Sequence, residues 1–298
     1  MIRFREVSKW YGSHAALRAL SFAVEPGEVV AVVGPNGSGK TTSLKAAAGL
    51  LRPTSGEVLL GKESLPAHLP GSRRTISFLP QRVTFPGALT GAEVVDFYGR
   101  LRSAPPGRGR EVLKLAALNG ASGRMVSTYS GGMVQRLGLA VAALPEAEVL
   151  LLDEPTASLD APGIQAMRRL IAAARAKGSA VLFTSHQLED VQQLADRVVI
   201  LVEGRLAAEL SRPELETRLA LGGMLRLELD RCPPEVLAGV STLATAPEWD
   251  GRFLTVRGSP EERARVVEAV AGAGIALRAL SSTEGGLEAL YRELGVAP

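Results

Sequence analysis

The chain has 298 residues, 46% of them hydrophobic and 22% charged, which is typical of a globular protein with a sizeable core. Its one cysteine, Cys232, excludes an internal disulfide and is typical of a reducing compartment. No apolar run approaches the roughly 18 residues of a membrane span, and the N-terminus carries no secretory leader pattern, so we expect a cytoplasmic protein.

The formal net charge of +3 is unevenly distributed along the chain. Residues 1–210 hold 24 Lys and Arg against 18 Asp and Glu, a net charge of +6, and residues 211–298 hold 10 against 13, a net charge of −3. The densest basic cluster surrounds a Pro/Gly turn and consists of Arg100, Arg102, Arg108, Arg110 and Lys114. No aromatic residues alternate with it as stacking platforms, so we interpret it as a solvated loop and expect no nucleic-acid partner.

The first 80 residues predict short strands. Residues 2–7 alternate as an edge strand would, and residues 21–24 can pair with them. Residues 57–60 and 75–79 have the character of further strands. The mostly β-branched run Val29–Val33 lies between residues 24 and 57 and is typical of a buried strand in a parallel sheet.

A glycine-rich turn follows that buried run, with the sequence Gly34-Pro35-Asn36-Gly37-Ser38-Gly39-Lys40-Thr41-Thr42. A helical segment comes next, so strand, turn and helix stand in the order that the phosphate-binding pattern GxxxxGK[ST] requires. The glycines let the backbone approach a ligand, and the freed N–H groups and the helix N-terminus attract anions. Lys40 would place its charge between the β- and γ-phosphates, and Thr41 would offer a hydroxyl group to Mg²⁺.

From residue 82 to about 143 the pattern changes to helices. Thr90 and Glu93 have the spacing of a capping box at the start of the first helix. Alternating strands and helices return afterwards, with strands expected at 149–152, 180–183, 198–202 and 205–208 and helices at about 163–176 and 187–195. This alternation predicts an α/β fold with a mostly parallel sheet and helices on its faces. The helical block is then an insertion into that sheet.

The remainder of the chain predicts a second, smaller domain. Residues 211–222 are expected to form a linker, because Pro213 and Gly222 interrupt a stretch of weak periodicity. Residues 223–298 are expected to form a small α+β, ferredoxin-like domain. Its expected strands are 225–229, 253–256 and 275–279, and its expected helices are 259–272 and 287–294.

Polar side chains stand at the ends of several expected strands of the parallel sheet. Asp153 and Glu154 follow one strand, His186 follows the next, and Gln81 follows an earlier one. The carboxyl ends of parallel strands meet at one edge of the sheet, where the glycine-rich turn also lies. There, Asp153 can reach Mg²⁺ through a water molecule, and Glu154 can lie beside an attacking water. Ser130-Gly131-Gly132 opens a helix and so forms a second anion-binding end.

The order of these motifs over residues 1–210 resembles the ATP-binding subunit of an ABC transporter. The resemblance implies a P-loop NTPase (RecA-like) fold with an N-terminal antiparallel β part and a helical subdomain at about 82–143, and it implies ATP and Mg²⁺ as ligands. The matching motifs are the Walker A loop with Lys40 and Thr41, the Q-loop with Gln81, the signature Ser130-Gly131-Gly132, Walker B with Asp153 and Glu154, the D-loop with Asp160 and the H-loop with His186.

The resemblance also implies a role for each of these residues. Glu154, His186 and Gln81 would act in hydrolysis, and Thr41, Gln81 and Asp153 would hold the metal. The ATP-binding residues would be the turn from Gly34 to Thr42, the signature, Asp160, and Tyr11, which would stack on adenine.

The implied partners are a second ATP-binding subunit and a membrane-spanning permease. In such proteins two subunits face head to tail, and each ATP lies between the Walker A loop of one and the signature of the other. The chain would then be peripheral on the inner face of the cell membrane, attached through its permease.

Departures from the commonest motifs narrow the resemblance. The signature reads Tyr129-Ser-Gly-Gly-Met133, which, together with the closing segment 286–294, resembles exporter-type single-domain ATPases. Residues 78–85 and 89–93 resemble the ATPase of the copper-related transporter that matures nitrous-oxide reductase.

Two other classes remain as alternatives to a transporter subunit. One is a soluble ABC ATPase acting on nucleic acid or in iron–sulfur assembly, although translation-associated members usually carry two ATPase cassettes in one chain and this chain has one. The other is an unrelated P-loop kinase or GTPase, which would leave the signature at 130–132 and His186 unexplained.

Overall fold

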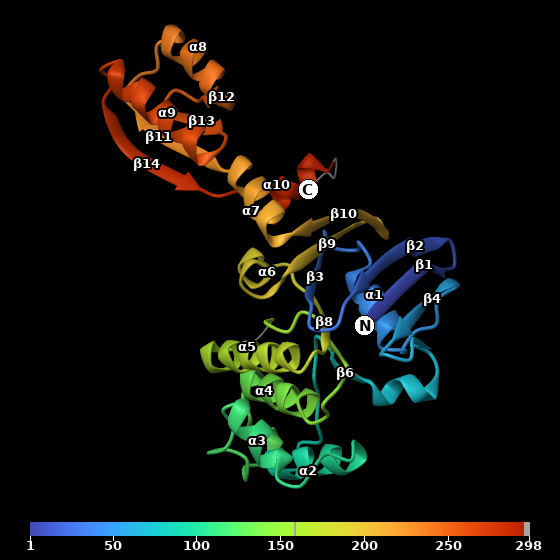
Figure 1. Cartoon of the computed structure of the whole chain (residues 1–298). Helices are drawn as coiled ribbons and strands as arrows, with labels where there is room; N and C mark the ends of the chain where they lie inside the picture. The colour runs from blue at the N-terminus through green and yellow to red at the C-terminus, as the bar shows by residue number, and fades with distance from the viewer. Residues whose placement is uncertain (158, 295–298) are drawn as a thin grey trace. The chain divides into compact units, whose positions relative to one another are not determined.

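The chain forms two compact units, Met1–Glu209 and Leu210–Pro298 (Figure 1). The computed structural model describes residues 1–157 and 159–294. Within the described residues, the first unit is built on two sheets and the second on one.

The first unit is built around a six-stranded sheet with the strand order β10-β9-β3-β8-β7-β6. The strands from β9 to β6 pair in parallel, as the sequence predicts. All residues of β3, β7 and β8 are buried, which explains why all of them except Thr184 are apolar. The six strands are β3 (Val29–Val33), β6 (Ile76–Leu79), β7 (Val149–Leu152), β8 (Ala180–Thr184), β9 (Arg197–Val202) and β10 (Arg205–Ser211).

An antiparallel sheet with the order β2-β1-β4-β5 forms the N-terminal β part. Its members are β1 (Ile2–Tyr11), β2 (His14–Val24), β4 (Ser55–Leu60) and β5 (Leu65–Pro66). The first two strands are longer than predicted, and Tyr11 is the last residue of β1. Helix α1 (Lys40–Ala47) contacts strands of both sheets, and one buried core includes Phe4, Leu44 and Leu182.

Three α-helices form most of the insertion between β6 and β7, and Figure 1 shows them in the lower part of the view. They are α2 (Gly91–Leu101), α3 (Arg108–Leu115) and α4 (Gly131–Ala142). The predicted capping box of α2 is confirmed, since the Glu93 carboxylate accepts the Thr90 N–H and the Thr90 hydroxyl accepts the Glu93 N–H. The other α-helices among the described residues of the first unit are α5 (Ala161–Ala176) and α6 (Leu188–Leu194).

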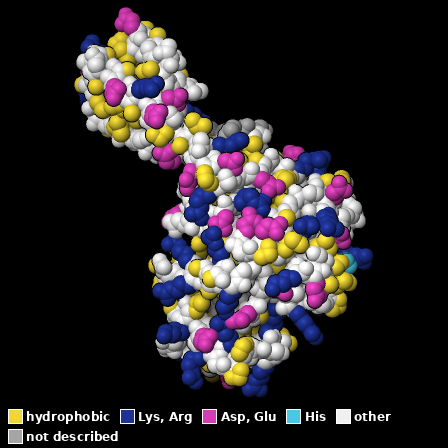
Figure 2. All heavy atoms as spheres, in the orientation of Figure 1, with side chains coloured by type: hydrophobic (Ala, Val, Ile, Leu, Met, Phe, Trp, Pro, Cys, Tyr) yellow, Lys and Arg dark blue, Asp and Glu magenta, His cyan; other side chains and the backbone are white. Residues whose placement is uncertain are grey.

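Members of the basic cluster at 100–114 take part in the fold of this unit. Arg102 donates to the carbonyl group of Ile76, and Arg108 donates to that of Ala143. On the face shown in Figure 2, Lys and Arg side chains of the first unit are dispersed among acidic and uncharged ones. Among the described residues, no helix combines the length and apolar character needed to cross a bilayer.

The second unit contains a four-stranded antiparallel sheet with the order β12-β13-β11-β14. With helices after the first and third strands, this is the predicted ferredoxin-like β-α-β-β-α-β arrangement. Strand β14 lies at an edge of the sheet, and all seven of its residues are exposed. The elements are α7 (Arg212–Leu221), β11 (Met224–Leu229), α8 (Pro234–Leu243), β12 (Thr245–Trp249), β13 (Phe253–Arg257), α9 (Pro260–Gly272), β14 (Leu277–Thr283) and α10 (Leu287–Glu293).

The prediction of a linker at 211–222 is wrong, because helix α7 occupies this stretch. Ser211 and Glu214 form a capping box in which the Glu214 carboxylate accepts the Ser211 N–H at 2.7 Å. Pro213 lies in the first helical turn, where its missing N–H would have no partner in any case. The proline that suggested a linker therefore starts a helix. Helix α8 and strand β12 were not predicted.

A pair of glycine substitutions tests the close packing of the first unit. Gly49 and Gly178 both have positive φ, 67° and 79°. A Cβ at Gly49 would lie 2.2 Å from the Ala67 carbonyl oxygen, whereas one at Gly178 would meet no described atom within 4 Å. We expect Gly178→Ala to lower the free energy of unfolding by about 1–2 kcal/mol, the usual cost of left-handed backbone.

Gly49→Ala should lower the free energy of unfolding by about 1–3 kcal/mol more, since the backbone must also move. Urea denaturation of the two variants measures the difference. Equal losses would mean that the contact with Ala67 is absorbed without strain.

Candidate nucleotide-binding site

The glycine-rich turn joins β3 to α1, and its backbone approaches neighbouring strands closely. Gly39 has φ of 100°, and a Cβ there would lie 2.6 Å from the Ala16 carbonyl oxygen, so only glycine fits. Gly37 has φ of 80°, and a Cβ there would meet no described atom within 4 Å. The turn is thus packed on one side and open on the other, where a ligand can reach its N–H groups.

A pocket lies over the open side of the turn. Tyr11 contributes from the end of β1, is 54% exposed, and has Lys9 Nζ 5.2 Å from its ring centroid. His14, the first residue of β2, also lines the pocket. The lining residues are Tyr11, His14, Ala16, Asn36, Gly37, Ser38, Gly39, Lys40, Thr41, Thr42 and Glu154.

Lys40 is the cation of this pocket. Its side chain is buried, and its Nζ donates to the carbonyl oxygens of Gly34 at 2.7 Å and Pro35 at 3.0 Å. Burial lowers the pKa of Lys40, while the nearby carboxylates of Glu154 and Asp153 act in the opposite direction. No described carboxylate forms an ion pair with Lys40, so its charge is available to an anionic ligand.

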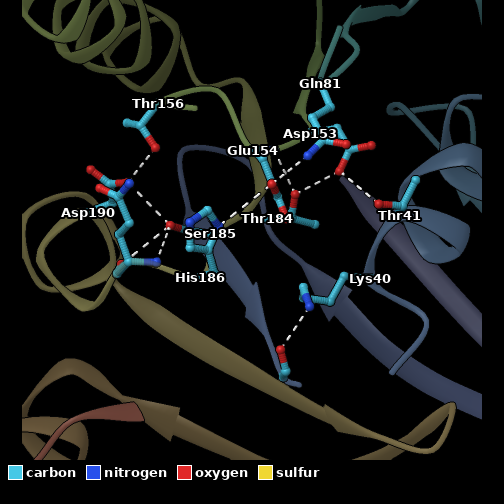
Figure 3. A network of polar contacts seen from close by, with 12 residues as sticks. Lys40, Thr41, Gln81, Asp153, Glu154, Thr156, Thr184, Ser185, His186 and Asp190 are labelled. Carbon is cyan, nitrogen blue, oxygen red and sulfur yellow. Dashed lines mark hydrogen bonds and ion pairs between the residues drawn. The ribbon is translucent and has the colours of Figure 1, made fainter. Parts of the chain in front are cut away.

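Asp153 connects the turn to the ends of two strands (Figure 3). Its Oδ1 accepts hydrogen bonds from Thr184 Oγ1 at 2.8 Å and from Thr41 Oγ1 at 3.2 Å. The carboxylate is only 2% exposed. This burial raises the pKa of Asp153, and the two hydroxyl hydrogen bonds lower it by less. A buried carboxylate beside a threonine hydroxyl is an oxygen-rich position suited to a hard cation.

Glu154 brings the three predicted catalytic side chains together. Its Oε2 accepts a hydrogen bond from Gln81 Nε2 at 2.6 Å and lies 3.6 Å from His186 Nδ1 (Figure 3). Its N–H donates to Thr184 Oγ1 at 2.8 Å. The residue has φ of 45°, a left-handed conformation that is uncommon outside glycine and typical of functional sites.

The signature residues and Asp160 do not line this pocket. Ser130 caps α4, where its Oγ accepts the Met133 N–H at 3.3 Å; Gly131 and Gly132 are the first residues of that helix. Asp160 caps α5 by accepting the Gly163 N–H at 3.0 Å and forms an ion pair with Arg136 at 3.3 Å. Within one chain, then, the glycine-rich turn and the signature lie at the N-termini of two different helices, α1 and α4, and helix N-termini favour anions.

The donor groups present fit a nucleotide phosphate and a magnesium ion. The buried Ser38 hydroxyl has no hydrogen-bond partner among the described residues, and it lies in the turn where phosphate oxygens would bind. Thr41 and Asp153 supply only oxygen ligands, as Mg²⁺ prefers, and Mg²⁺ usually completes its shell with phosphates and waters. No cluster of three or more His, Cys, Asp and Glu in the described part of the chain could hold a metal by itself.

Comparison with known proteins identifies the family. Residues 17–157 match the family model described as ABC transporter. An uncharacterized ABC transporter ATP-binding protein of Bacillus subtilis, YxlF, is 40% identical over 225 residues, which are 72% of each chain. The chain belongs to the ABC transporter family. The doxorubicin resistance ATP-binding protein DrrA of Mycobacterium tuberculosis is 37% identical to this ABC protein over 218 residues, 71% of this chain and 66% of DrrA.

Solved structures agree with this assignment. The ATP-binding cassette MJ0796, solved as a dimer in a post-hydrolysis state with ADP and phosphate, superposes with a TM-score of 0.64. It is 28% identical, and the match covers 71% of this chain and 99% of that one. The resemblance drawn from the sequence is therefore confirmed at the level of fold and family: the chain is an ABC ATPase that binds and hydrolyses ATP. An unrelated kinase or GTPase is excluded.

Some contacts of the site were not predicted from the sequence. Thr184 was not singled out, although it ends β8 directly before Ser185 and His186, and a hydroxyl at that position was the available signal. Thr156 and Asp190 were missed entirely. Their hydrogen bond joins residues 34 positions apart, which no local pattern reveals.

The assignment of Lys40 is tested by its removal. Lys40→Ala should weaken ATP binding by about 10- to 100-fold or more, because charge-assisted hydrogen bonds are worth about 1.5–3 kcal/mol each. Titration with a fluorescent ATP analogue measures the affinity. Lys45→Ala is the matched control, since Lys45 is exposed on the same helix. Unchanged affinity in Lys40→Ala would place the phosphates elsewhere.

Proposed function

We propose that two copies of this ABC ATPase close head to tail around two ATP molecules and drive the movement of a substrate through a separate membrane-spanning permease. The observation that carries the proposal is the position of Glu154. Its carboxylate lies at the edge of the Walker A pocket and touches both Gln81 and His186.

Glu154 is the proposed general base for hydrolysis. A water molecule would attack the γ-phosphorus and pass a proton to the Glu154 carboxylate while the bond to the ADP oxygen breaks. His186 and Gln81 contact the same carboxylate oxygen and can orient the base, the water and the γ-phosphate. Lys40 would hold the β- and γ-phosphates.

Mg²⁺ would be held by Thr41, Asp153 and Gln81. When bound, the ion neutralises charge on the phosphates. The protein's part is to present oxygen atoms: the Thr41 hydroxyl already donates to Asp153 Oδ1, which places the two groups together. Gln81 would have to turn its amide oxygen toward the ion, since its amide nitrogen faces Glu154.

The second subunit would supply the other half of each ATP site. The signature Ser130-Gly131-Gly132 begins α4, a helix of 12 residues whose N-terminal N–H groups favour anions. Because these residues and Asp160 do not line the Walker A pocket of their own chain, we assign them to the ATP bound by the partner. Tyr11, at the exposed rim, would stack on the adenine.

The permease would dock on the helical insertion. This part of the unit exposes large apolar side chains that the core does not use: Phe97, Leu101 and Met125 are 59%, 66% and 56% exposed. A groove in the same insertion begins at Gln81 and also includes Phe85 and residues of α4. Docking would place the ATPase at the inner face of the membrane, although the chain provides no spanning helix within its described part.

An exporter is the proposed transporter type. The signature variant Tyr129 and Met133 and the segment 286–294 favour it, and the relative DrrA is named for doxorubicin resistance.

The narrower proposal, a copper-related transporter that matures nitrous-oxide reductase, rests on residues 78–85 and 89–93 alone. Nothing in the comparisons favours an ATPase acting on nucleic acid or in iron–sulfur assembly. Identification of the membrane protein that co-purifies in detergent tests both proposals.

Removal of the base separates binding from hydrolysis. Glu154→Gln should bind ATP normally and hydrolyse it about 10²–10⁴ times more slowly, the usual cost of losing a positioned base. Because the γ-phosphate then persists, the variant should elute as a dimer in size-exclusion chromatography with ATP and as a monomer with ADP. Glu63→Gln is the control, as Glu63 is an exposed carboxylate outside the pocket. A wild-type rate in Glu154→Gln would move the role to another group.

Gln81 tests the coupling to the permease. It lies between β6 and the helical insertion, so its side chain can sense the γ-phosphate while its backbone continues to the docking groove. A ligand shifts the equilibrium between separated subunits and the closed dimer only by its difference in affinity for these two states, and the γ-phosphate supplies that difference. Gln81→Ala should bind ATP nearly normally but lose stimulation of its ATPase activity by the reconstituted permease.

The control for this variant is Gln193→Ala, which removes an exposed glutamine of α6 that faces Glu189. Its stimulation by the permease should equal that of the wild type. Full stimulation and transport by Gln81→Ala, or stimulation of the wild type by nucleic acid instead of membrane protein, would contradict the transporter assignment.

A further inference from the structure

A buried carboxylate lies behind the catalytic loops, outside the nucleotide pocket. Asp190 belongs to α6 and is 6% exposed. Its Oδ2 accepts hydrogen bonds from Thr156 Oγ1 at 2.6 Å and from Ser185 Oγ at 3.2 Å. Figure 3 shows the three side chains converging. Burying a carboxylate costs free energy unless its oxygens are hydrogen-bonded, so these two hydroxyl groups are what makes its position tolerable.

The two hydroxyl groups belong to the two loops that carry the proposed catalytic residues. Thr156 follows Glu154 by two positions, and Ser185 directly precedes His186. Asp190 therefore ties the loop after β7 to the loop after β8. This tie is independent of the direct contact between His186 and Glu154.

The backbone conformation at Glu154 requires restraint by hydrogen bonds from neighbouring elements. Its φ of 45° is a strained conformation, which persists only where the surroundings hold it. On one side, the Glu154 N–H donates to Thr184 Oγ1 at 2.8 Å. On the other side, the hydrogen bond between Thr156 and Asp190 fixes the chain two residues later. The strained residue is thus held from both sides by groups at the end of β8 and the start of α6.

A second set of hydrogen bonds rigidifies the loop of His186. The Ser185 Oγ that donates to Asp190 also accepts the Gln187 N–H at 3.0 Å. The backbone on both sides of His186 is therefore restrained by one hydroxyl group, whose hydrogen can be accepted by Asp190 Oδ2 at 3.2 Å or by the Gln187 carbonyl oxygen at 3.3 Å.

We propose that Asp190 is a positioning residue for ATP hydrolysis, which sets the spacing between Glu154 and His186 by holding Thr156 and Ser185. This inference rests on the catalytic roles proposed above for Glu154 and His186. Asp190 does not line the nucleotide pocket, so its effect reaches the reaction through the two loops and leaves ATP binding unchanged.

Substitution of Asp190 in the full chain tests the proposal. Asp190→Ala should lower kcat by about 10- to 100-fold, because a displacement of about 1 Å in catalytic groups costs up to about 10² in rate. The KM for ATP should change by less than about twofold, since no pocket contact is lost. Asp190→Asn should restore most of kcat, because the amide oxygen can still accept two hydrogen bonds.

Two further variants separate positioning from general destabilisation. Glu189→Ala removes the neighbouring exposed carboxylate of the same helix, which contacts Gln193 and Arg168, and should keep the wild-type rate. In a His186→Ala background, Asp190→Ala should cost less than it does in the wild type, since one of the two loops that Asp190 positions no longer carries a catalytic side chain. Steady-state ATPase kinetics and thermal unfolding of every variant provide the readouts.

The outcomes distinguish the positioning role of Asp190 from the catalytic roles proposed for Glu154 and His186. A wild-type kcat in Asp190→Ala alongside a slow His186→Ala would overturn the role of Asp190 alone. Losses that multiply in the double variant, or no recovery in Asp190→Asn, would also overturn it. Wild-type rates in both Glu154→Gln and His186→Ala would overturn the catalytic roles themselves, and this inference with them.

A different pair of variants applies if Asp190→Ala does not fold. Thr156→Val and Ser185→Ala remove the two hydroxyl donors one at a time and leave the carboxylate in place. Each should lower kcat and leave KM for ATP unchanged. A wild-type kcat in both would overturn the proposal.

Discussion

The nucleotide site depends on the parallel register of β3, β8 and β7. Val32 pairs with Thr184, and Phe183 pairs with Leu152, so the three strands end at the same level. The glycine-rich turn, the Thr184 hydroxyl and Asp153 therefore leave the sheet at one edge. Side chains alternate between the faces of a strand, so a slip of one residue would turn Thr184 away from Asp153. Apart from Thr184, the residues of these strands are apolar, and their burial on both faces keeps the register in place.

Site residues that lie in a recognisable local pattern, such as a glycine-rich turn or the end of an apolar strand, could be predicted from the sequence. The glycine-rich turn has a spacing that only a phosphate loop explains, and Glu154 and His186 each follow an apolar strand. The hydrogen bond between Thr156 and Asp190 could not be predicted, because each residue has ordinary neighbours. Their association depends on how α6 packs beside the end of β7, which is a property of the tertiary structure.

The elements of the second unit that were not predicted correctly, α7, α8 and β12, all contain proline. Proline can interrupt a helix or strand, but it can also lie in the first turn of a helix. Pro213 suggested an interruption, yet it lies in the first turn of a helix, where a fixed φ is favourable, and Pro234 has the same position in α8. Pro247 lies in β12, an edge strand, where its missing N–H costs no hydrogen bond to a neighbour. Pro260 was correctly predicted to lie at the start of a helix, because Ser259 and Glu262 on either side of it have the spacing of a capping box.

The edge strand β14 has a consequence for the behaviour of the purified protein. Its seven residues are exposed, including Leu277 and Leu280 at 42% and 48%, and an edge of this kind is a template for pairing with another chain. Association through β14 would increase with protein concentration and be indifferent to nucleotide. Closure around ATP would respond to the γ-phosphate at any concentration that permits dimers. A dimer of this ATPase in solution is therefore informative about its catalytic cycle only when ATP and ADP are compared side by side.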